Sequence, residues 1–463
     1  MFRLLRAGCA VGALLVSPWA TAQSPCASSH KGVFYANDFS YLSDPNYDGA
    51  CFGDLLKQNE LAGGQLGTYD IGGQLRLRQH SELGMGREVG DLNGFGDTNN
   101  DFLLTRLRLY TNWQATENVR FFGELINANL AADESYVPRA IDEDPINFLN
   151  LFFDTKLTDE TTFRIGRQEL LYGAQRTVSP LDWANTRRTF EGIKVIHKEG
   201  DWAVDGFFTA FVPPQADEWD TADWQQQFYG CYGTYSGAKN AVYDFYYLGY
   251  DNRQTYQPGK DAPGSRDFSL HTFGGRMLAT QDAWLFEVEG ALQTGRQSGL
   301  GLDQRAAFVT GGVGRNFDVE WSPTLWFYYD YATGNDGNGA WNRYNQLFPL
   351  AHKYLGFIDS AQRSNISSPN CLLTAAPADK LSLLFWYYYL GAAQAGDIVP
   401  GVGFNTDQNT TSRDFGHELD TIVQYQICPR SNILFGYSHL WRGEKIIGTR
   451  DADFFYTQWE TNF

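Results

Sequence analysis

The residues of this 463-residue chain with the clearest chemistry are arginines at every second position of two stretches. Arg76 and Arg78 lie in IGGQLRLRQH, and Arg106 and Arg108 lie in FLLTRLRLYTNW, with one leucine between the members of each pair. A guanidinium group presents a planar fork of donors that fits a carboxylate through two hydrogen bonds. Several such groups on one surface would favour anions over cations.

Only a β-strand would place these arginines on one face, because its side chains alternate with a period of two. An arginine that faces lipid at the bilayer midplane costs about 2–4 kcal/mol. We therefore expect the leucines to face lipid and the arginines to face a water-filled lumen. The same alternation directs Arg120 and Glu124 inward from VRFFGEL.

Two further pairs of charged residues are spaced by three rather than two. Arg164 and Arg167 in RIGRQ cannot both face inward without a bulge, and Glu191 and Lys194 in FEGIK pose the same problem. The predicted pore-lining and substrate-binding residues are Arg76, Arg78, Arg106, Arg108, Arg120, Glu124, Arg167, Glu191, Lys194 and Arg276.

Short and long connections alternate along the chain. Eight short segments rich in Asn, Asp, Gly and Pro have the composition of antiparallel turns, near residues 115–118, 158, 200, 237–240, 279–282, 317–322, 375–380 and 428–432. Nine long polar segments separate them, at roughly 80–100, 131–146, 171–187, 213–223, 252–266, 296–303, 334–364, 394–411 and 443–450. This pattern predicts an all-β fold, a transmembrane antiparallel up-and-down β-barrel of about 18 strands with an aqueous lumen.

The two ends of the chain carry targeting signals. Residues 1–22 have two arginines, an apolar run and a small-residue cleavage site, as in a secretory signal peptide. Residues 23–64 lack periodicity and are expected to form a periplasmic lead-in, with the barrel at 65–463. The last strand alternates and ends in Phe463, which resembles the signal that the barrel-assembly machinery recognises.

Composition narrows the class of protein. After residue 22 no run of about 20 apolar residues could form a transmembrane helix, whereas low mean hydropathy (−0.38) beside 16% aromatic residues is compatible with tilted barrel strands. The formal net charge is −18, and removal of Arg3 and Arg6 leaves 34 basic against 54 acidic residues, or −20. So acidic a chain is not expected to bind nucleic acid. We expect one monomeric domain in contact with outer-membrane lipid.

Cysteines and loop carboxylates offer little further chemistry. Without Cys9, five cysteines remain, so at least one thiol is unpaired, and Cys26 and Cys51 could close a small loop. The loops at 91–101 and 334–342 contain Asp and Asn that could bind calcium, but neither has EF-hand spacing, and turn chemistry explains both. No cofactor is expected.

Two segments resemble the alginate-export family of outer-membrane β-barrels. They are RIGRQELLYG and RTVSPLDWANTRRTFEGIKV, and the resemblance continues through NQLFPLAHKYLGFID and FGHELD. It implies a channel that passively conducts an anionic polysaccharide or a related carboxylate, with possible periplasmic export components as partners. The pore arginines of the family would correspond to Arg76, Arg106, Arg120 and Arg167.

Two other functions remain as alternatives. A general or small-carboxylate uptake porin would show similar inward charges. An outer-membrane hydrolase would need a nucleophile beside a base, but Ser438 and His439 are adjacent on a strand and point to opposite faces. We therefore expect no enzymatic activity.

Overall fold

Nineteen strands and six short 3-10 turns make up the fold of the protein, seen in a computed structural model that describes residues 25–47, 49, 51–401 and 406–463. The predicted signal peptide lies outside the described residues. The strands are β1 (Asn59–Glu60), β2 (Thr68–Leu83), β3 (Asn99–Thr116), β4 (Val119–Ala132), β5 (Asp144–Lys156), β6 (Thr161–Gln168), β7 (Thr189–Glu199), β8 (Trp202–Val212), β9 (Asp223–Tyr235), β10 (Ala241–Asn252), β11 (Phe268–Gln281), β12 (Trp284–Gln297), β13 (Leu302–Asn316), β14 (Thr324–Ala332), β15 (Ile366–Ala378), β16 (Leu381–Gly391), β17 (Asp414–Cys428), β18 (Ser431–Arg442) and β19 (Ala452–Asn462).

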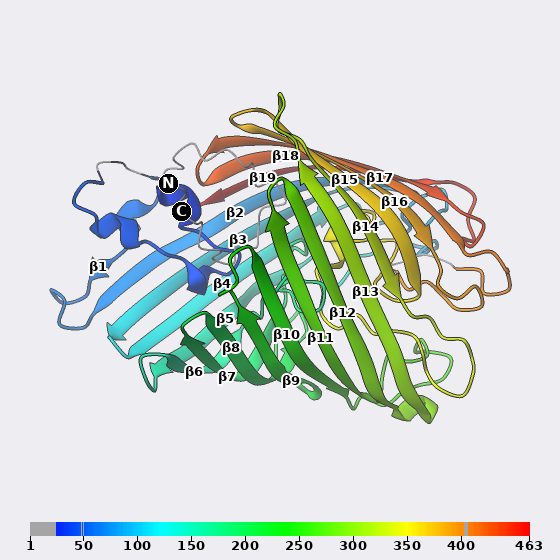
Figure 1. Ribbon diagram of the computed structural model, residues 1–463, viewed down its shortest axis with the longest axis horizontal. Helices are drawn as coiled ribbons and strands as arrows, with labels where there is room; N and C mark the ends of the chain where they lie inside the picture. Colours follow the sequence, from blue (N-terminus) through cyan, green and yellow to red (C-terminus); the bar gives the residue numbers. More distant parts are fainter. Residues whose placement is uncertain (1–24, 48, 50, 402–405) are drawn as a thin grey trace.

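Strands β2 to β19 form a closed antiparallel barrel. Each strand pairs with its neighbours in the chain, and β19 pairs with β2 over Asp453–Asn462 and Gln74–Leu83. The predicted connections fall between the observed strands, which confirms the eighteen-stranded barrel. The prediction of a long loop at 296–303 is wrong, since only residues 298–301 join β12 to β13. The first barrel strand begins and the last one ends at the short-turn rim. The N-terminal turns pack there beside the C-terminus (Figure 1).

The 3-10 turns are brief and belong to the connections and the N-terminal part of the chain, not to the strands of the wall. They are η1 (Pro25–Ser28), η2 (Phe34–Ala36), η3 (Ser40–Ser43), η4 (Asp54–Leu56), η5 (Ser298–Leu300) and η6 (Ala351–Lys353). Among the described residues, no helix has the length and apolar character needed to cross a bilayer.

The two faces of the wall differ in chemistry. Outward side chains are large and apolar and remain exposed, for example Leu107 at 38%, Phe245 at 56% and Leu292 at 69%. Inward positions of the same sheet carry Arg, Glu, Asp and Gln that are buried within the barrel. Because exposed apolar surface of this extent is stable in lipid and not in water, the outward face is the membrane face.

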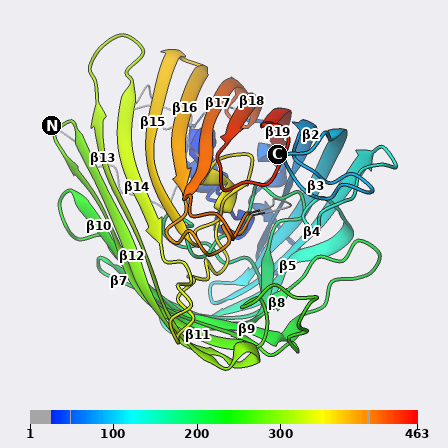
Figure 2. The same ribbon diagram turned by 90° about the vertical axis from the view of Figure 1, so that its right-hand side faces the viewer.

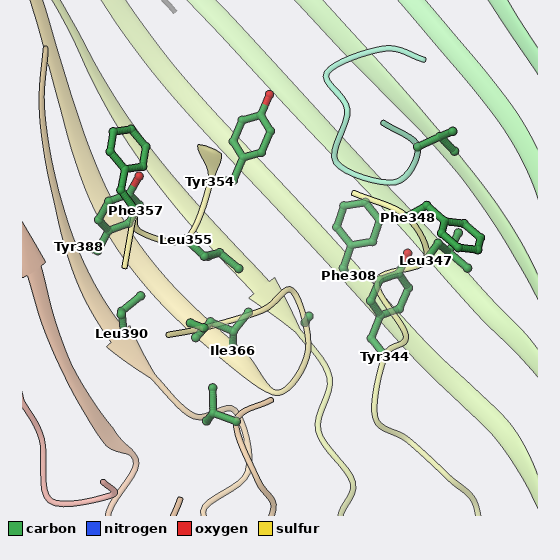
Figure 3. Close-up of a cluster of buried hydrophobic side chains, with 14 of the residues drawn as sticks. Phe308, Tyr344, Leu347, Phe348, Tyr354, Leu355, Phe357, Ile366, Tyr388 and Leu390 are labelled. Carbon is green, nitrogen blue, oxygen red and sulfur yellow. The ribbon is translucent and has the colours of Figure 1, made fainter. Parts of the chain in front are cut away.

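The interior of the barrel is largely filled by its own loops. The β14–β15 connection, residues 333–365, turns inward and packs Phe348, Tyr354 and Phe357 against inward side chains of the wall (Figure 3). The β6–β7 connection, residues 169–188, joins it through a backbone bridge between Val178 and Phe348. Figure 2 shows these loops within the ring of strands.

The described residues between 25 and 60, which we call the N-terminal segment, form a small unit at the short-turn rim. A disulfide bond joins Cys26 to Cys51, as the sequence allowed, whereas Cys231, Cys371 and Cys428 are free thiols. Arg430, in the β17–β18 turn, forms an ion pair with Asp54 (2.9 Å) and donates to the Phe52 carbonyl. The segment is therefore held to the finished barrel by contacts with its last strands.

Candidate pore constriction

Seven arginines form a continuous band on one side of the lumen, which we call the arginine row. Six come from neighbouring strands and one from the 169–188 loop. They are Arg76 and Arg78 on β2, Arg106 and Arg108 on β3, Arg120 on β4, Arg164 on β6, and Arg187 in the loop. The strands place them together because Arg76 pairs with Arg106 across β2 and β3, and alternate residues of each strand share the inward face.

The 169–188 loop leaves the wall early and crosses to the arginine row. Strand β6 has only eight residues, so the chain turns inward at Glu169. A left-handed backbone conformation at Gly173 (φ +49°) assists this turn, and any Cβ there would lie 2.2 Å from the Tyr232 hydroxyl. A larger residue at this position would therefore strain the turn by which the loop enters the lumen.

Main-chain carbonyl oxygens at the tip of this loop occupy the donors of the row. Arg76 donates to the carbonyls of Asp182 (2.8 Å) and Ala184 (3.1 Å), and Arg106 donates to the same two carbonyls at 3.1 Å. Arg78 donates to the Trp183 carbonyl, and its guanidinium carbon lies 3.9 Å from the centre of the Trp183 ring. The loop thus presents neutral acceptors to charged donors.

Positive charge exceeds negative charge in this band. Four carboxylates pair with the row: Asp182 with Arg106 and Arg187, Glu124 with Arg108, Glu169 with Arg187, and Asp154 with Arg120 and Arg164. Within the described residues, Arg76 and Arg78 have no carboxylate within 4.0 Å. In addition, Nε and Nη1 of Arg78 are buried without a hydrogen-bond partner. Unpaired buried donors are costly, so Arg78 retains unsatisfied hydrogen-bonding capacity within the lumen.

Asp182 is the acid most closely surrounded by the row. Burial alone would raise the pKa of Asp182, but the Arg187, Arg106 and Arg76 guanidinium groups outweigh it and hold that pKa well below its usual range. Its side chain is 51% exposed, whereas its partner Arg106 is fully buried. The carboxylate is therefore ionised at neutral pH and faces solvent inside the barrel.

The two lumenal loops meet at an aromatic stack. The rings of Trp183 and His352 lie parallel, with an interplanar angle of 6° and centroids 3.5 Å apart. On its other side His352 stacks on Phe357, and its Nδ1 lies 3.0 Å from Asp359 Oδ2. The stack links the 169–188 and 333–365 loops in front of β2.

Glu124, Lys194 and Arg276 also face inward, but each is bound to neighbours. Glu124 Oε1 accepts from Arg108 Nε at 2.6 Å. Lys194 lies 2.7 Å from Asp205. Arg276 lies 2.7 Å from Glu287, which also pairs with Arg176 of the 169–188 loop. Lys194 is the cross-strand neighbour of Arg164 at the edge of the arginine row, whereas Arg276 on β11 belongs to a separate charge cluster.

The predicted inward orientation of Arg167 and Glu191 is wrong. Strand β6 contains no bulge, so Arg164 and Arg167, three residues apart, face opposite sides, and Arg164 is the inward one. Arg167 is paired in register with Leu151, which is 50% exposed on the outer face. Its ion pair with Glu191 (3.1 Å) is therefore on the outside of the wall, at the long-loop end of both strands.

Several residues of the constriction were not predicted from the sequence. Asp154 carried a usable signal, because it alternates with apolar neighbours in FFDTK as Glu124 does in its own strand. Glu169, Asp182 and Arg187 carried none, since they lie in a loop whose path depends on tertiary contacts. Only the family motif RTVSPLDWANTRRTFEGIKV, which contains Asp182 and Arg187, pointed to this part of the chain.

The 334–342 loop, one of the two considered for calcium, contains ordinary turn contacts. Asp336 Oδ1 accepts from the Asn338 amide (2.9 Å) and from Asn342 Nδ2 (2.7 Å). Across the described part of the chain, no three His, Cys, Asp or Glu side chains are arranged to hold a metal ion.

A closed barrel with an apolar exterior and a polar interior narrowed by inward loops is the architecture of an outer-membrane channel. The sequence matches the alginate-export family over residues 69–457, and the chain belongs to that family. This confirms the resemblance seen in the sequence motifs. Curated proteins gave no significant match.

Solved structures with this fold include channels of Pseudomonas aeruginosa. OpdK has a TM-score of 0.58 and 12% identity, covering 85% of this chain and 99% of that one. OccK3 (OpdO) has a TM-score of 0.57 and 11% identity, with 85% and 96% covered. OccK2 (OpdF) in complex with glucuronate has a TM-score of 0.56 and 11% identity, with 85% and 98% covered. At these identities the similarity concerns the fold alone.

Proposed function

We propose that the protein passively conducts an anionic saccharide or a related carboxylate, and that the arginine row is the element that selects for negative charge. The observation that carries this proposal is the excess of guanidinium over carboxylate groups in the row, where seven arginines face four ion-paired carboxylates and the more distant Glu460, which is in register with Arg76. Fixed positive charge replaces part of the hydration that an anion loses in a narrow passage.

The paired acids of the row serve conduction as well as stability. Glu124 and Asp182 hold Arg108 and Arg106 in place, and they lower the net positive charge of the passage. A channel must bind its solute well enough to admit it and weakly enough to release it. In this arrangement the short-turn rim faces the periplasm and the long loops face outward, as in other outer-membrane barrels.

Polyuronates are the first candidate substrate class. The family is named for alginate export, and a uronate carboxylate has the planar geometry that a guanidinium fork binds. A second candidate is uptake of small carboxylates. It is favoured by the contact between Trp183 and His352, which narrows the lumen, and by the glucuronate complex of OccK2, a barrel of the same fold.

Single-channel recording in planar bilayers tests the proposal. The wild type is expected to be anion-selective in a salt gradient and to be blocked by oligouronates but not by a neutral oligosaccharide of equal length. Arg76→Gln combined with Arg78→Gln should reduce both properties, because it removes two positive charges that form no ion pair within 4.0 Å in the described part of the chain. Arg315→Gln, at an exposed position on the outer face, is the matched control. A cation-selective or unselective pore that is indifferent to oligouronate and to the double substitution would refute the proposal.

A further inference from the structure

Part of the N-terminal segment reaches up into the lumen and covers the short-turn end of the arginine row. The ring of Phe34 is 3% exposed and lies 3.8 Å from the guanidinium carbon of Arg108. The ring of Tyr35 lies 4.4 Å from Arg164. Two aromatic faces are therefore stacked on two guanidinium groups.

Main-chain oxygens of the same stretch fill further donors. Arg120 donates to the Tyr35 carbonyl (3.0 Å), and Arg187 donates to the Gly32 carbonyl (2.8 Å). The Tyr35 hydroxyl in turn donates to the carbonyl of Glu169 (2.7 Å), where the 169–188 loop begins. Residues from opposite ends of the lumen thus meet at the row.

Residues 29–35 offer the row only neutral groups. Their sequence, SHKGVFY, contains no carboxylate. The charges of the four covered arginines are balanced instead by carboxylates of the wall and the 169–188 loop, namely Glu124, Asp154, Glu169 and Asp182. A hydrogen bond from a guanidinium is already strengthened by the charge of the donor, and an ionised acceptor adds a Coulomb attraction to it. A uronate carboxylate would accept from the Arg120 and Arg187 donors that now bond to the Tyr35 and Gly32 carbonyls, and it would add a Coulomb attraction that these neutral oxygens lack.

The stretch is anchored immediately outside the lumen. Cys26 is three residues before Ser29, and its disulfide partner Cys51 precedes the ion pair of Asp54 with Arg430. Lys57 donates to the carbonyl of Phe463 (3.1 Å). Displacement of residues 29–35 from the row would leave these anchors intact, so the stretch could leave and return without detaching from the barrel.

We propose that residues 29–35 are a tethered plug that occupies the short-turn end of the arginine row, and that an anionic saccharide competes with it for Arg108, Arg120, Arg164 and Arg187. This inference rests on the proposed function, because it requires a carboxylate-bearing solute in the lumen. It adds that the binding site is covered by the protein's own chain at rest, and that the solute opens its own path.

Hydrogen exchange on the intact wild-type protein in detergent micelles tests the competition directly. Saturating oligouronate should increase amide exchange in residues 29–35, whereas a neutral oligosaccharide of equal length should leave it unchanged. Peptides around Asp54 should keep their protection in both cases. Unchanged or reduced exchange in residues 29–35, at an oligouronate concentration that blocks the channel, would overturn the inference.

A substitution supplies the second test. Phe34→Ala combined with Tyr35→Ala should raise single-channel conductance at least twofold and lower the half-blocking oligouronate concentration about tenfold, because the site no longer has to be vacated first. Leu55→Ala is the matched control, since Leu55 lies in the same segment and is 92% exposed.

The two proposals fail in different ways. Normal anion selectivity and block that are both unaffected by the double substitution would overturn the plug and leave the proposed function standing. Absence of anion selectivity and of block in every variant would refute the proposed function, and it would refute the plug proposal as well.

Discussion

Replacement of Asp182 by Asn should make the channel more selective for anions. The substitution is nearly isosteric and keeps a side-chain oxygen that can accept from Arg106, which lies 2.9 Å away. It removes one negative charge from a site whose pKa the surrounding guanidinium groups hold far below neutrality, so the full charge is lost at pH 7. The half-exposed position of the side chain means that passing ions experience the change.

The size of the effect can be worked from electrostatics. At about 7 Å in water, one unit charge changes the energy of a monovalent ion by about 0.6 kcal/mol. Screening lowers this to about 0.3 kcal/mol at 0.1 M salt and to about 0.5 kcal/mol at 0.01 M. Because anions gain what cations lose, the anion-to-cation permeability ratio should rise about threefold at 0.1 M and about fivefold at 0.01 M.

Reversal potentials in planar bilayers, taken across salt gradients centred on these two concentrations, measure that ratio. Asp159→Asn, which removes a charge from the exposed β5–β6 turn, controls for a general change in net charge. If Asp182→Asn lowers the ratio, leaves it constant, or changes it equally at both concentrations, ions do not pass this carboxylate and the proposed path is wrong.

Three further predictions concern the segments that fill the lumen. Burial, followed by the charges of Arg430 and Lys57, lowers the pKa of His30 to about 3, so the docking of the N-terminal segment should weaken by about 1–2 kcal/mol as pH falls from 7 to 5, because the undocked chain takes up a proton that the docked chain excludes. Hydrogen exchange of residues 29–35 at the two pH values should show this for the wild type but not for His30→Gln. Cys26→Ser combined with Cys51→Ser opens a loop with a sequence separation of 25 and should destabilise the N-terminal segment by about 3 kcal/mol. Limited proteolysis should then cleave residues 25–60 while the thermal transition of the barrel stays in place, and loss of the barrel itself would contradict this. Trp183→Ala removes the stack on His352 and the contact with Arg78, together about 2 kcal/mol, and should raise conductance by separating the two lumenal loops. Trp219→Ala, at an exposed position in the 213–222 loop, should leave conductance unchanged.

The barrel could be predicted from sequence because its determinants are local. Alternation in LRLR fixes the faces of β2 and β3, since a one-residue slip would place arginines in lipid. Clusters of Asn, Asp, Gly and Pro mark the turns independently of anything distant in the chain. The inward orientation of Arg76, Arg78, Arg106 and Arg108 followed from the same local rule.

The constriction could be predicted only in part. In RIGRQ, two arginines three residues apart must face opposite sides. The glycine between them has no side chain and gives no apolar signal for which side faces lipid. Arg164 is the inward arginine because it is paired in register with the inward-facing Asp154 of β5. Register between strands depends on both strands and is not a local property of the sequence. The acceptors from Asp182 to Ala184 are main-chain carbonyls, which every residue type possesses. No sequence pattern can therefore show that a loop reaches across the lumen to use them.

The seating of the N-terminal segment depends on groups from both extremes of the chain. Its partners include Arg108 near the beginning, and Arg430 and the Phe463 carbonyl at the very end. Contacts of such high sequence separation form last, because the intervening chain must first be ordered. Because β19 pairs with β2 beside these partners, the docking surface is complete only when the seam between the two strands is closed. Docking of the N-terminal segment is consequently a check on completed assembly. The segment can dock fully only on a barrel whose last strand, β19, is already paired with its first, β2.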